Sequence, residues 1–295
     1  MRLPLLLFAA AAIYLAACAE SSGLNPGDRT GPRGTVVLGQ VDLSFYAVTG
    51  EVTQRLLKRR GYAVEVVTGD HATIYPQLGR GEVHLLAASW LPTGHAGLFA
   101  EVAGEVERLT PLYGDARFYW AVPAYVPEEE VGSVADLTSE AVAARMPDTI
   151  ATLPNGTGLT VASRELAEAY GLDAAYRLVP GGPEAWTASL RDAVDEEAWT
   201  VLPLWQPQWV NAAYDLRELD DPRGVLPPPD TAWLIAHRTL RDVVDEATLD
   251  ELAALRLTVA EVTEMDRLVN VEGLTPAEAA LRWERGELDA KNRDD

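Results

Sequence analysis

Residues 35–88 read TVVLGQVDLSFYAVTGEVTQRLLKRRGYAVEVVTGDHATIYPQLGRGEVHLLAA and alternate between strand-like and helix-like segments. The strand candidates are Thr35–Val41, Ala63–Thr68 and Val83–Ala88. Between them, Gly50–Arg60 has apolar residues separated by charges and is closed by Gly61, and Ile74–Leu78 lies in a second short helix. This order of elements predicts a parallel sheet with helices on both faces.

A second alternating unit begins after the hydrophobic stretch Phe118–Val126. Its strand candidates are Asp148–Leu153, Tyr176–Val179 and Trp199–Leu204, and its helix candidates are Leu159–Tyr170 and Pro183–Glu196. Beyond Pro227–Pro229, the strand-like Thr231–Ala236 leads into helices that continue through Arg285. Two α/β units with a helical C-terminal return predict two lobes joined by two crossings. We expect lobe I at 35–122 and 223–295, and lobe II at 123–222.

The N-terminus predicts export. Met1-Arg2 supplies one positive charge, and Leu3–Ala17 is an apolar run too short to span a bilayer comfortably but typical of a signal peptide. The run ends in LAAC at Cys18, which resembles the bacterial lipobox, in which the cysteine becomes the acylated first residue. We predict a signal peptide over 1–17, lipidation at Cys18, and a flexible tether over 18–34. An ordinary signal peptide with an incidental Cys18 is the alternative.

Composition narrows the class of protein. The chain has 295 residues, 48% of them apolar and 23% charged, which is the balance of a folded, soluble protein. Its net charge is −21, and removing residues 1–17 takes away only Arg2, so the mature chain would carry −22. A polyanion without a basic stripe repels nucleic acid. Since Cys18 is the single cysteine, no disulfide within the chain is possible, and lipidation of Cys18 would leave no thiol for catalysis or metal binding.

Three loops that follow predicted strands carry the candidate site residues. They are SWLPTGH (residues 89–95), PNGTGL (residues 154–159) and WQPQW (residues 205–209). In open α/β sheets, ligands bind outside the carboxyl ends of the strands, so Trp90 and Trp205 are expected in the cleft. Trp209, on the following helix, is expected in the core. His95 follows Trp90 by five residues at the same cleft mouth, although a lone histidine also commonly faces solvent.

The loop at residues 154–159 is suited to an anion. Gly156 and Gly158 permit a tight turn, and free amide N–H groups at the start of a helix attract negative charge. A carboxylate is a suitable guest for such a loop. A simple capped turn, without a ligand, explains the same residues equally well.

Four stretches resemble the substrate-binding proteins of glycine betaine/proline betaine ABC importers: SWLPTGH, AVPAYV…SVADL, AYGL and PLWQPQWVNAAYDLRELDDP. The resemblance covers roughly Val36 to Pro222. It implies an α/β, two-lobe periplasmic-binding-protein fold (type II). Each lobe would be a mixed, mainly parallel sheet flanked by helices, with the ligand in the interlobe cleft. It also implies capture of a glycine betaine-like osmolyte, osmoprotection, delivery to ABC permease subunits, and a lipid-anchored location in the cell envelope outside the cytoplasm.

The resemblance also assigns residues. Trp90 and Trp205 match two tryptophans of an aromatic cage for a trimethylammonium group, His95 matches a carboxylate-binding histidine, and Gly158-Leu159 match a pair of carboxylate-binding amides. Where relatives place a third cage tryptophan, this chain has Leu43, followed by Ser44, Phe45 and Tyr46. A cation over a ring gains about 0.5–2 kcal/mol, so losing one ring weakens binding by up to about 30-fold. Phe45 or Tyr46 is a candidate substitute, or the ligand is a different small amine or zwitterion.

An enzyme and a sensing lipoprotein are the two alternative functions. An enzyme is disfavoured because the four histidines show no metal-binding spacing and no Gly-x-Ser-x-Gly or phosphate-loop motif occurs; Asp70-His71 lacks a nearby nucleophile. No cofactor or metal is expected. A lipoprotein that senses another amine or an amino-acid derivative, uncoupled from transport, would have the same cleft. Sequence leaves that second alternative open.

Overall fold

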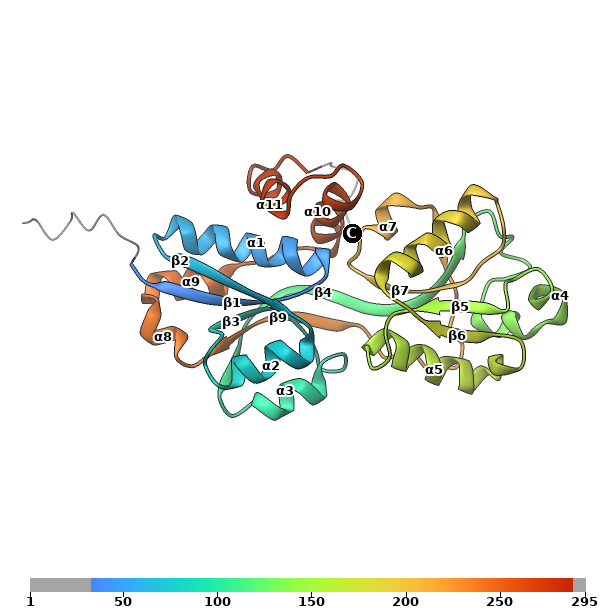
Figure 1. Cartoon of the computed structure of the whole chain (residues 1–295), viewed down its shortest axis with the longest axis horizontal. Helices are drawn as coiled ribbons and strands as arrows, with labels where there is room; N and C mark the ends of the chain where they lie inside the picture. Colours follow the sequence, from blue (N-terminus) through green and yellow to red (C-terminus); the bar gives the residue numbers. More distant parts are fainter. Residues whose placement is uncertain (1–32, 289–295) are drawn as a thin grey trace, which may run out of the picture. The chain divides into compact units, whose positions relative to one another are not determined.

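The computed structural model describes residues 33–288, which form one compact unit from Arg33 onward (Figure 1). The predicted signal peptide and Cys18 lie outside the described residues, as does all but the last two residues of the tether. Within 33–288, no helix combines the length and apolarity that a membrane span requires.

Nine strands and eleven α-helices are assigned within the described range. The strands are β1 (Thr35–Val41), β2 (Ala63–Gly69), β3 (Leu85–Leu91), β4 (Val106–Pro123), β5 (Thr149–Thr152), β6 (Arg177–Pro180), β7 (Leu202–Gln206), β8 (Leu216–Glu218) and β9 (Asp230–His237). The helices are α1 (Ser44–Arg59), α2 (His71–Gly79), α3 (Ala96–Val102), α4 (Glu140–Ala143), α5 (Gly158–Tyr170), α6 (Pro183–Asp195), α7 (Val210–Ala213), α8 (Leu240–Val243), α9 (Glu246–Ala254), α10 (Val259–Asn270) and α11 (Pro276–Glu284). The alternation of strands and helices predicted from the sequence is therefore present.

The strands form a large sheet of order β2-β1-β3-β9-β4-β7, with β8 also paired to β4, and a small sheet of β5 and β6. β1 pairs in parallel with both β2 and β3, and β5 pairs in parallel with β6. β9 runs antiparallel to β3 and β4, and β7 and β8 run antiparallel to β4. The large sheet is thus mixed, as expected, but its pairs are mostly antiparallel rather than mainly parallel, whereas the small sheet is parallel. The lobe boundaries predicted at 122/123 and 222/223 stay a prediction.

Helices cover both faces of β1 and β3, as the β-α-β-α-β order predicts. A side chain on Gly50 of α1 would meet Gln40 and Leu38, whereas one on Gly39 would meet Ile74 of α2, so α1 and α2 lie on opposite faces of β1. Figure 1 shows α1 on one side of these strands and α2 and α3 on the other. α1 begins at Ser44 rather than at the predicted Gly50, because Phe45, Val48 and Val52 continue one buried stripe.

Two strands end later than predicted, so Trp90 and Trp205 lie within strands and not in the loops after them. β3 continues to Leu91 because Trp90 and Leu91 pair with Ala232 and Thr231 of β9. β7 likewise continues to Gln206, with Trp205 opposite Phe118. Trp90 and Trp205 are therefore the penultimate residues of their strands, and neither lies in the loop that follows.

The long strand β4 was largely missed by the sequence, which indicated only its end in Phe118–Val126. Its pairing with β9 covers Val106 to Ala116, and register shifts interrupt that pairing at three points. Asp115 there has a φ of +55°, a conformation that breaks the strand pattern. Beyond Ala116, the same strand pairs with β7 and β8. β4 therefore links the part of the large sheet formed by β1, β2, β3 and β9 to the part formed by β7 and β8.

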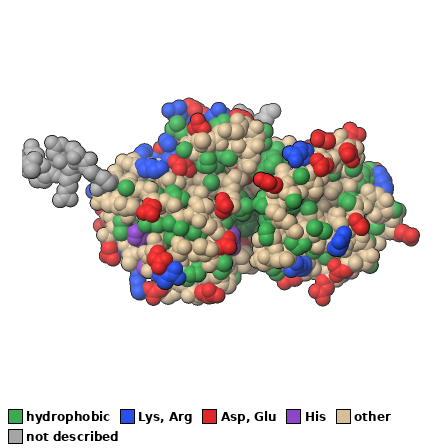
Figure 2. Space-filling view, in the orientation of Figure 1, with side chains coloured by type: hydrophobic (Ala, Val, Ile, Leu, Met, Phe, Trp, Pro, Cys, Tyr) green, Lys and Arg blue, Asp and Glu red, His purple; other side chains and the backbone are tan. Residues whose placement is uncertain are grey.

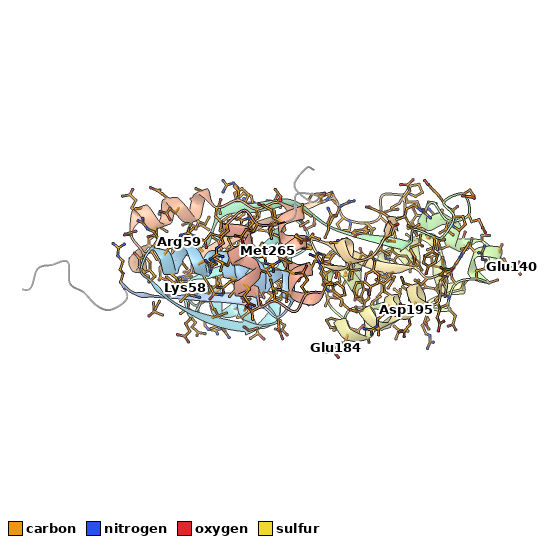
Figure 3. All side chains as sticks on the ribbon, turned by 90° about the horizontal axis from the view of Figure 1, so that it is seen from above. Lys58, Arg59, Glu140, Glu184, Asp195 and Met265 are labelled. Atoms are coloured by element: carbon orange, nitrogen blue, oxygen red, sulfur yellow. The ribbon has the colours of Figure 1, made fainter. Side chains whose placement is uncertain are left out.

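Charged side chains are spread over the surface rather than gathered (Figure 2). At the C-terminal end of α1, Lys58 and Arg59 (labelled in Figure 3) complement the helix dipole. Arg59 and Arg55 both contact Glu284 of α11, which ties the C-terminal helices to α1. Met265 of α10, also labelled in Figure 3, is fully buried in the main core.

We expect Gly39→Ala to destabilise the fold. A Cβ at this position would lie 2.6 Å from Cγ2 of Ile74 and 3.0 Å from Cγ1 of Val83, both methyls of stiff, β-branched side chains. Overpacking of this kind costs about 1–3 kcal/mol of unfolding free energy. Gly97→Ala in α3 is the control, because its Cβ meets nothing within 4 Å and should stabilise by up to about 1 kcal/mol. Urea unfolding compares the two; equal stabilities would contradict the packing argument.

Candidate functional site

The seven residues expected to bind ligand all line one cavity of about 330 Å³. They are Leu43, Tyr46, Trp90, His95, Gly158, Leu159 and Trp205. Four segments distant in the sequence supply them: the start of α1, the end of β3 with its following turn, the start of α5, and the end of β7. The structure therefore brings the three predicted loops to one place.

Aromatic rings form the apolar end of this cavity. The ring of Phe45 lies 6.0 Å from that of Trp90 and 6.3 Å from that of Trp205, measured between centroids. Phe118 of β4 lies 5.7 Å from Trp90 on another side and also lines the cavity. Since the faces of such rings carry negative charge, this end suits an organic cation.

Phe45 contributes the third aromatic ring at this end of the cavity. Leu43 lines the cavity beside it and caps the N-terminus of α1 without a side-chain hydrogen bond. Tyr46 is as deeply buried as Phe45, but its ring contacts are with Phe45 and His71, and its hydroxyl lies 3.3 Å from Nε2 of His71. Of the two candidate substitutes for the missing tryptophan, Phe45 is the one whose ring contacts both Trp90 and Trp205.

The polar end of the cavity contains His95, held in one tautomer. The backbone N–H of Trp90 donates to Nδ1 of His95 at 2.8 Å, and the backbone N–H of His95 donates to the carbonyl of Trp90 at 2.9 Å. Because Nδ1 accepts, the proton of a neutral ring lies on Nε2. Burial, with a smaller contribution from His71, lowers the pKa of His95 well below its usual value. His95 is therefore a neutral donor through Nε2–H.

The start of α5 supplies further donors. Its N-cap, Thr157, makes no side-chain cap hydrogen bond to the first turn, so the N–H groups at Gly158 and Leu159 are left for another acceptor. Gly158 lies close to the ring of Phe118, where a Cβ would come within 3.0 Å of that ring. A glycine is thus required for the helix to approach the aromatic end. This end of α5 is suited to a carboxylate.

Two buried carboxylates hold the segments that carry the site. Asp230, at the start of β9 and 4% exposed, accepts the backbone N–H groups of Thr93 and Gly94 at 2.7 Å each, which fixes the turn before His95. Asp266 of α10 accepts the backbone N–H of Trp209 at 2.7 Å, just beyond β7. Burial raises the pKa of Asp266 to about 6.

A larger cavity of about 730 Å³ shares Leu43, Phe45 and Trp205 with the first cavity as lining residues. Trp209 lines this second cavity and not the first, and it is partly exposed rather than fully in the core. Asp42 and Pro183 border both cavities.

Among the residues that line the first cavity and that the sequence missed are Phe118, His71 and Asp70. Phe118 was hidden because β4 was not recognised as a long strand. His71 and Asp70 directly follow β2, whose carboxyl end lies at the same sheet edge as that of β1, and that position was the available signal. Among residues 33–288, no group of three or more His, Cys, Asp or Glu is placed to hold a metal ion.

The sequence matches the OpuAC family, described as the substrate binding domain of an ABC-type glycine betaine transport system, over residues 34–285. A curated relative from Listeria monocytogenes, the glycine betaine/carnitine transport binding protein GbuC, is 28% identical over 136 residues. That match covers 46% of this chain and 45% of the relative, so it spans about half the length of each.

Solved structures share the fold. Lactococcal OpuAC, in a closed conformation complexed with glycine betaine, is 26% identical with a TM-score of 0.75, over 86% of this chain and 96% of that one. A ProX protein from Borrelia burgdorferi gives a TM-score of 0.74 at 20% identity, over 88% and 98% of the two chains. The structure of a choline binding protein complexed with choline gives a TM-score of 0.72 at 18% identity. The match covers 86% of this chain and 88% of that one.

We expect Asp230→Ala to lower the free energy of unfolding by about 1–3 kcal/mol, because it leaves two backbone N–H groups without their acceptor. Asp242→Ala, at an exposed position of α8, is the control and should change stability by less than about 0.5 kcal/mol. Urea unfolding followed by tryptophan fluorescence gives both values. If Asp230→Ala is as stable as the control, the turn before His95 does not depend on this carboxylate.

Proposed function

The chain belongs to the OpuAC family of substrate-binding domains, and from this premise we propose that it captures a small quaternary-ammonium osmolyte, such as glycine betaine, outside the cytoplasm for an ABC importer. One observation carries the proposal: a single cavity combines an aromatic end formed by Phe45, Trp90 and Trp205 with a polar end of neutral N–H donors. These two ends match the two charged groups of a betaine.

The aromatic end is suited to the trimethylammonium group. Such a group cannot donate hydrogen bonds, so it is recognised by ring faces and by apolar contact rather than by pairing with acceptors. Phe45 offers a weaker face than the tryptophan that relatives place after the first strand, and Leu43 offers contact area without a ring. We therefore expect a weaker cage than one made of three tryptophans, by up to about 30-fold.

The polar end is suited to a carboxylate. Nε2–H of His95 and the first-turn amides of α5 are donors that reach one cavity from two different elements. Among the described residues that line it, none is Lys or Arg, so no permanently charged cation faces a carboxylate there. Choline carries no carboxylate and would leave these donors without an acceptor. This difference favours a zwitterion over choline.

The N-terminus supports export and anchoring. The signal-peptide pattern over 1–17 and the LAAC box at Cys18 indicate a lipoprotein, with residues 18–34 as the tether to the folded unit. An anchored receptor stays close to the permease subunits that it would supply. The permease and the ATPase are the partners implied by this proposal.

Trp90→Leu and Trp205→Leu should each weaken glycine betaine binding by about 1–3 kcal/mol, because each removes a ring face from the aromatic end. Trp283→Leu in α11, where the indole N–H donates to Glu261 away from the cavity, is the matched control and should bind as the wild type does. Calorimetry with glycine betaine, proline betaine, carnitine and choline measures the affinities of the wild type and the three variants. A wild type that binds none of these ligands would sink the proposed function.

Cys18→Ala should release the protein from the membrane, because it removes the acylation site while leaving the export signal in place. Fractionation of cells that express the wild type and the variant, followed by immunoblotting, measures the distribution. A Cys18→Ala protein that stays with the membrane fraction contradicts the lipid anchor and favours an ordinary signal peptide.

A further inference from the structure

A second imidazole lies at the polar end of the cavity. His71, the first residue of α2, lines the cavity together with His95, and the two ring centroids are 4.3 Å apart. The rings come from different elements, since His71 follows β2 and His95 follows β3. The resemblance and the family match account for His95, whereas His71 has no role assigned by either.

Tyr46, a residue of α1, contacts His71. Burial raises the pKa of Tyr46 well above its usual value, so the phenol keeps its proton. Its hydroxyl lies 3.3 Å from Nε2 of His71 and can donate to that nitrogen in the neutral tautomer whose proton is on Nδ1. When the ring gains a proton, the same hydroxyl accepts instead. Tyr46 can therefore hold His71 in either protonation state.

We propose that His71 is the second imidazole of the carboxylate end, and that it takes up a proton from solvent when a carboxylate-bearing ligand binds. This inference rests on the proposed function. It makes His71 a specificity-determining residue, because a bound carboxylate favours the charged ring whereas choline brings a cation and no carboxylate.

The groups that face His71 explain its neutral state in the free protein. Burial lowers the pKa of His71 to about 4, and Asp70, the N-cap of its own helix, opposes that shift only in part. From the β3–α3 turn it faces neutral His95, and from α1 it faces the protonated Tyr46. Asp42, from the turn before α1, lines the same cavity without an ion pair to either histidine among the contacts within 33–288.

The sign of the pH dependence follows. A carboxylate beside the ring stabilises the imidazolium, so the pKa of His71 is higher with the ligand bound than without it. The affinity for glycine betaine then rises as pH falls below the pKa of the bound state, and levels off near the free value of about 4. Choline affinity should fall slightly over the same range, because a charged His71 repels a cation.

Calorimetry at about pH 5, in two buffers with different ionisation enthalpies, counts the protons taken up on binding. The wild type should take up protons with glycine betaine and none with choline. His71→Gln, which cannot gain a charge, should abolish the uptake and lower the glycine betaine-to-choline affinity ratio about tenfold. His84→Gln is the control, since Nδ1 of His84 accepts the Val37 N–H outside the cavity.

The results of these measurements separate a proton-binding role of His71 from a structural one. Glycine betaine binding by the wild type without proton uptake overturns the inference, and needs no variant. Equal losses for glycine betaine and choline in His71→Gln also overturn it, because they show a structural role. Tyr46→Phe, which keeps the ring and removes the hydroxyl, should reduce the uptake even if His71→Gln fails to fold. A wild type that binds neither ligand rejects the proposed function itself.

Discussion

The polar end of the cavity depends on the hydrogen bond from the backbone N–H of Trp90 to Nδ1 of His95. This bond selects the tautomer in which Nε2 carries the proton, and so converts a residue that could accept or donate into a donor. It also connects the two ends of the cavity, because the same residue, Trp90, supplies an aromatic wall through its side chain and orients His95 through its backbone. Asp230 fixes the intervening turn through Thr93 and Gly94.

The substitution of Phe45 for a tryptophan changes more than the strength of the cage. Phe45 is a residue of α1, the helix that begins at the end of β1, and it is packed 4.1 Å from Tyr46 between ring centroids. Tyr46 in turn contacts His71. The third aromatic wall and the second imidazole are therefore joined through one helical turn, and a change at Phe45 reaches both ends of the cavity.

The alternation of β and α segments could be read from the sequence because apolar periodicity and the glycine at the end of α1 are local signals. Strand ends could not, because Trp90 and Trp205 remain in strands only through pairing with β9 and β4, which are distant in sequence. For the same reason β4 was hidden, since Pro111 and Asp115 look like turn residues and are tolerated at irregular points of its pairing with β9.

The residues that line the cavity could be predicted more fully than the ends of the strands, because they lie in short motifs with specific spacing. The position of His71 directly after β2 was a usable signal, but its contact with His95 could not be predicted, since the two rings meet only when β1, β2 and β3 are assembled. Its environment has a consequence for a protein that must release its ligand. A neutral His95, and a His71 that is charged only while a carboxylate is bound, hold a carboxylate less strongly than a permanently charged arginine would, and weaker binding shortens the lifetime of a complex. A carboxylate end without a fixed cation therefore suits a receptor that both captures a ligand and gives it up.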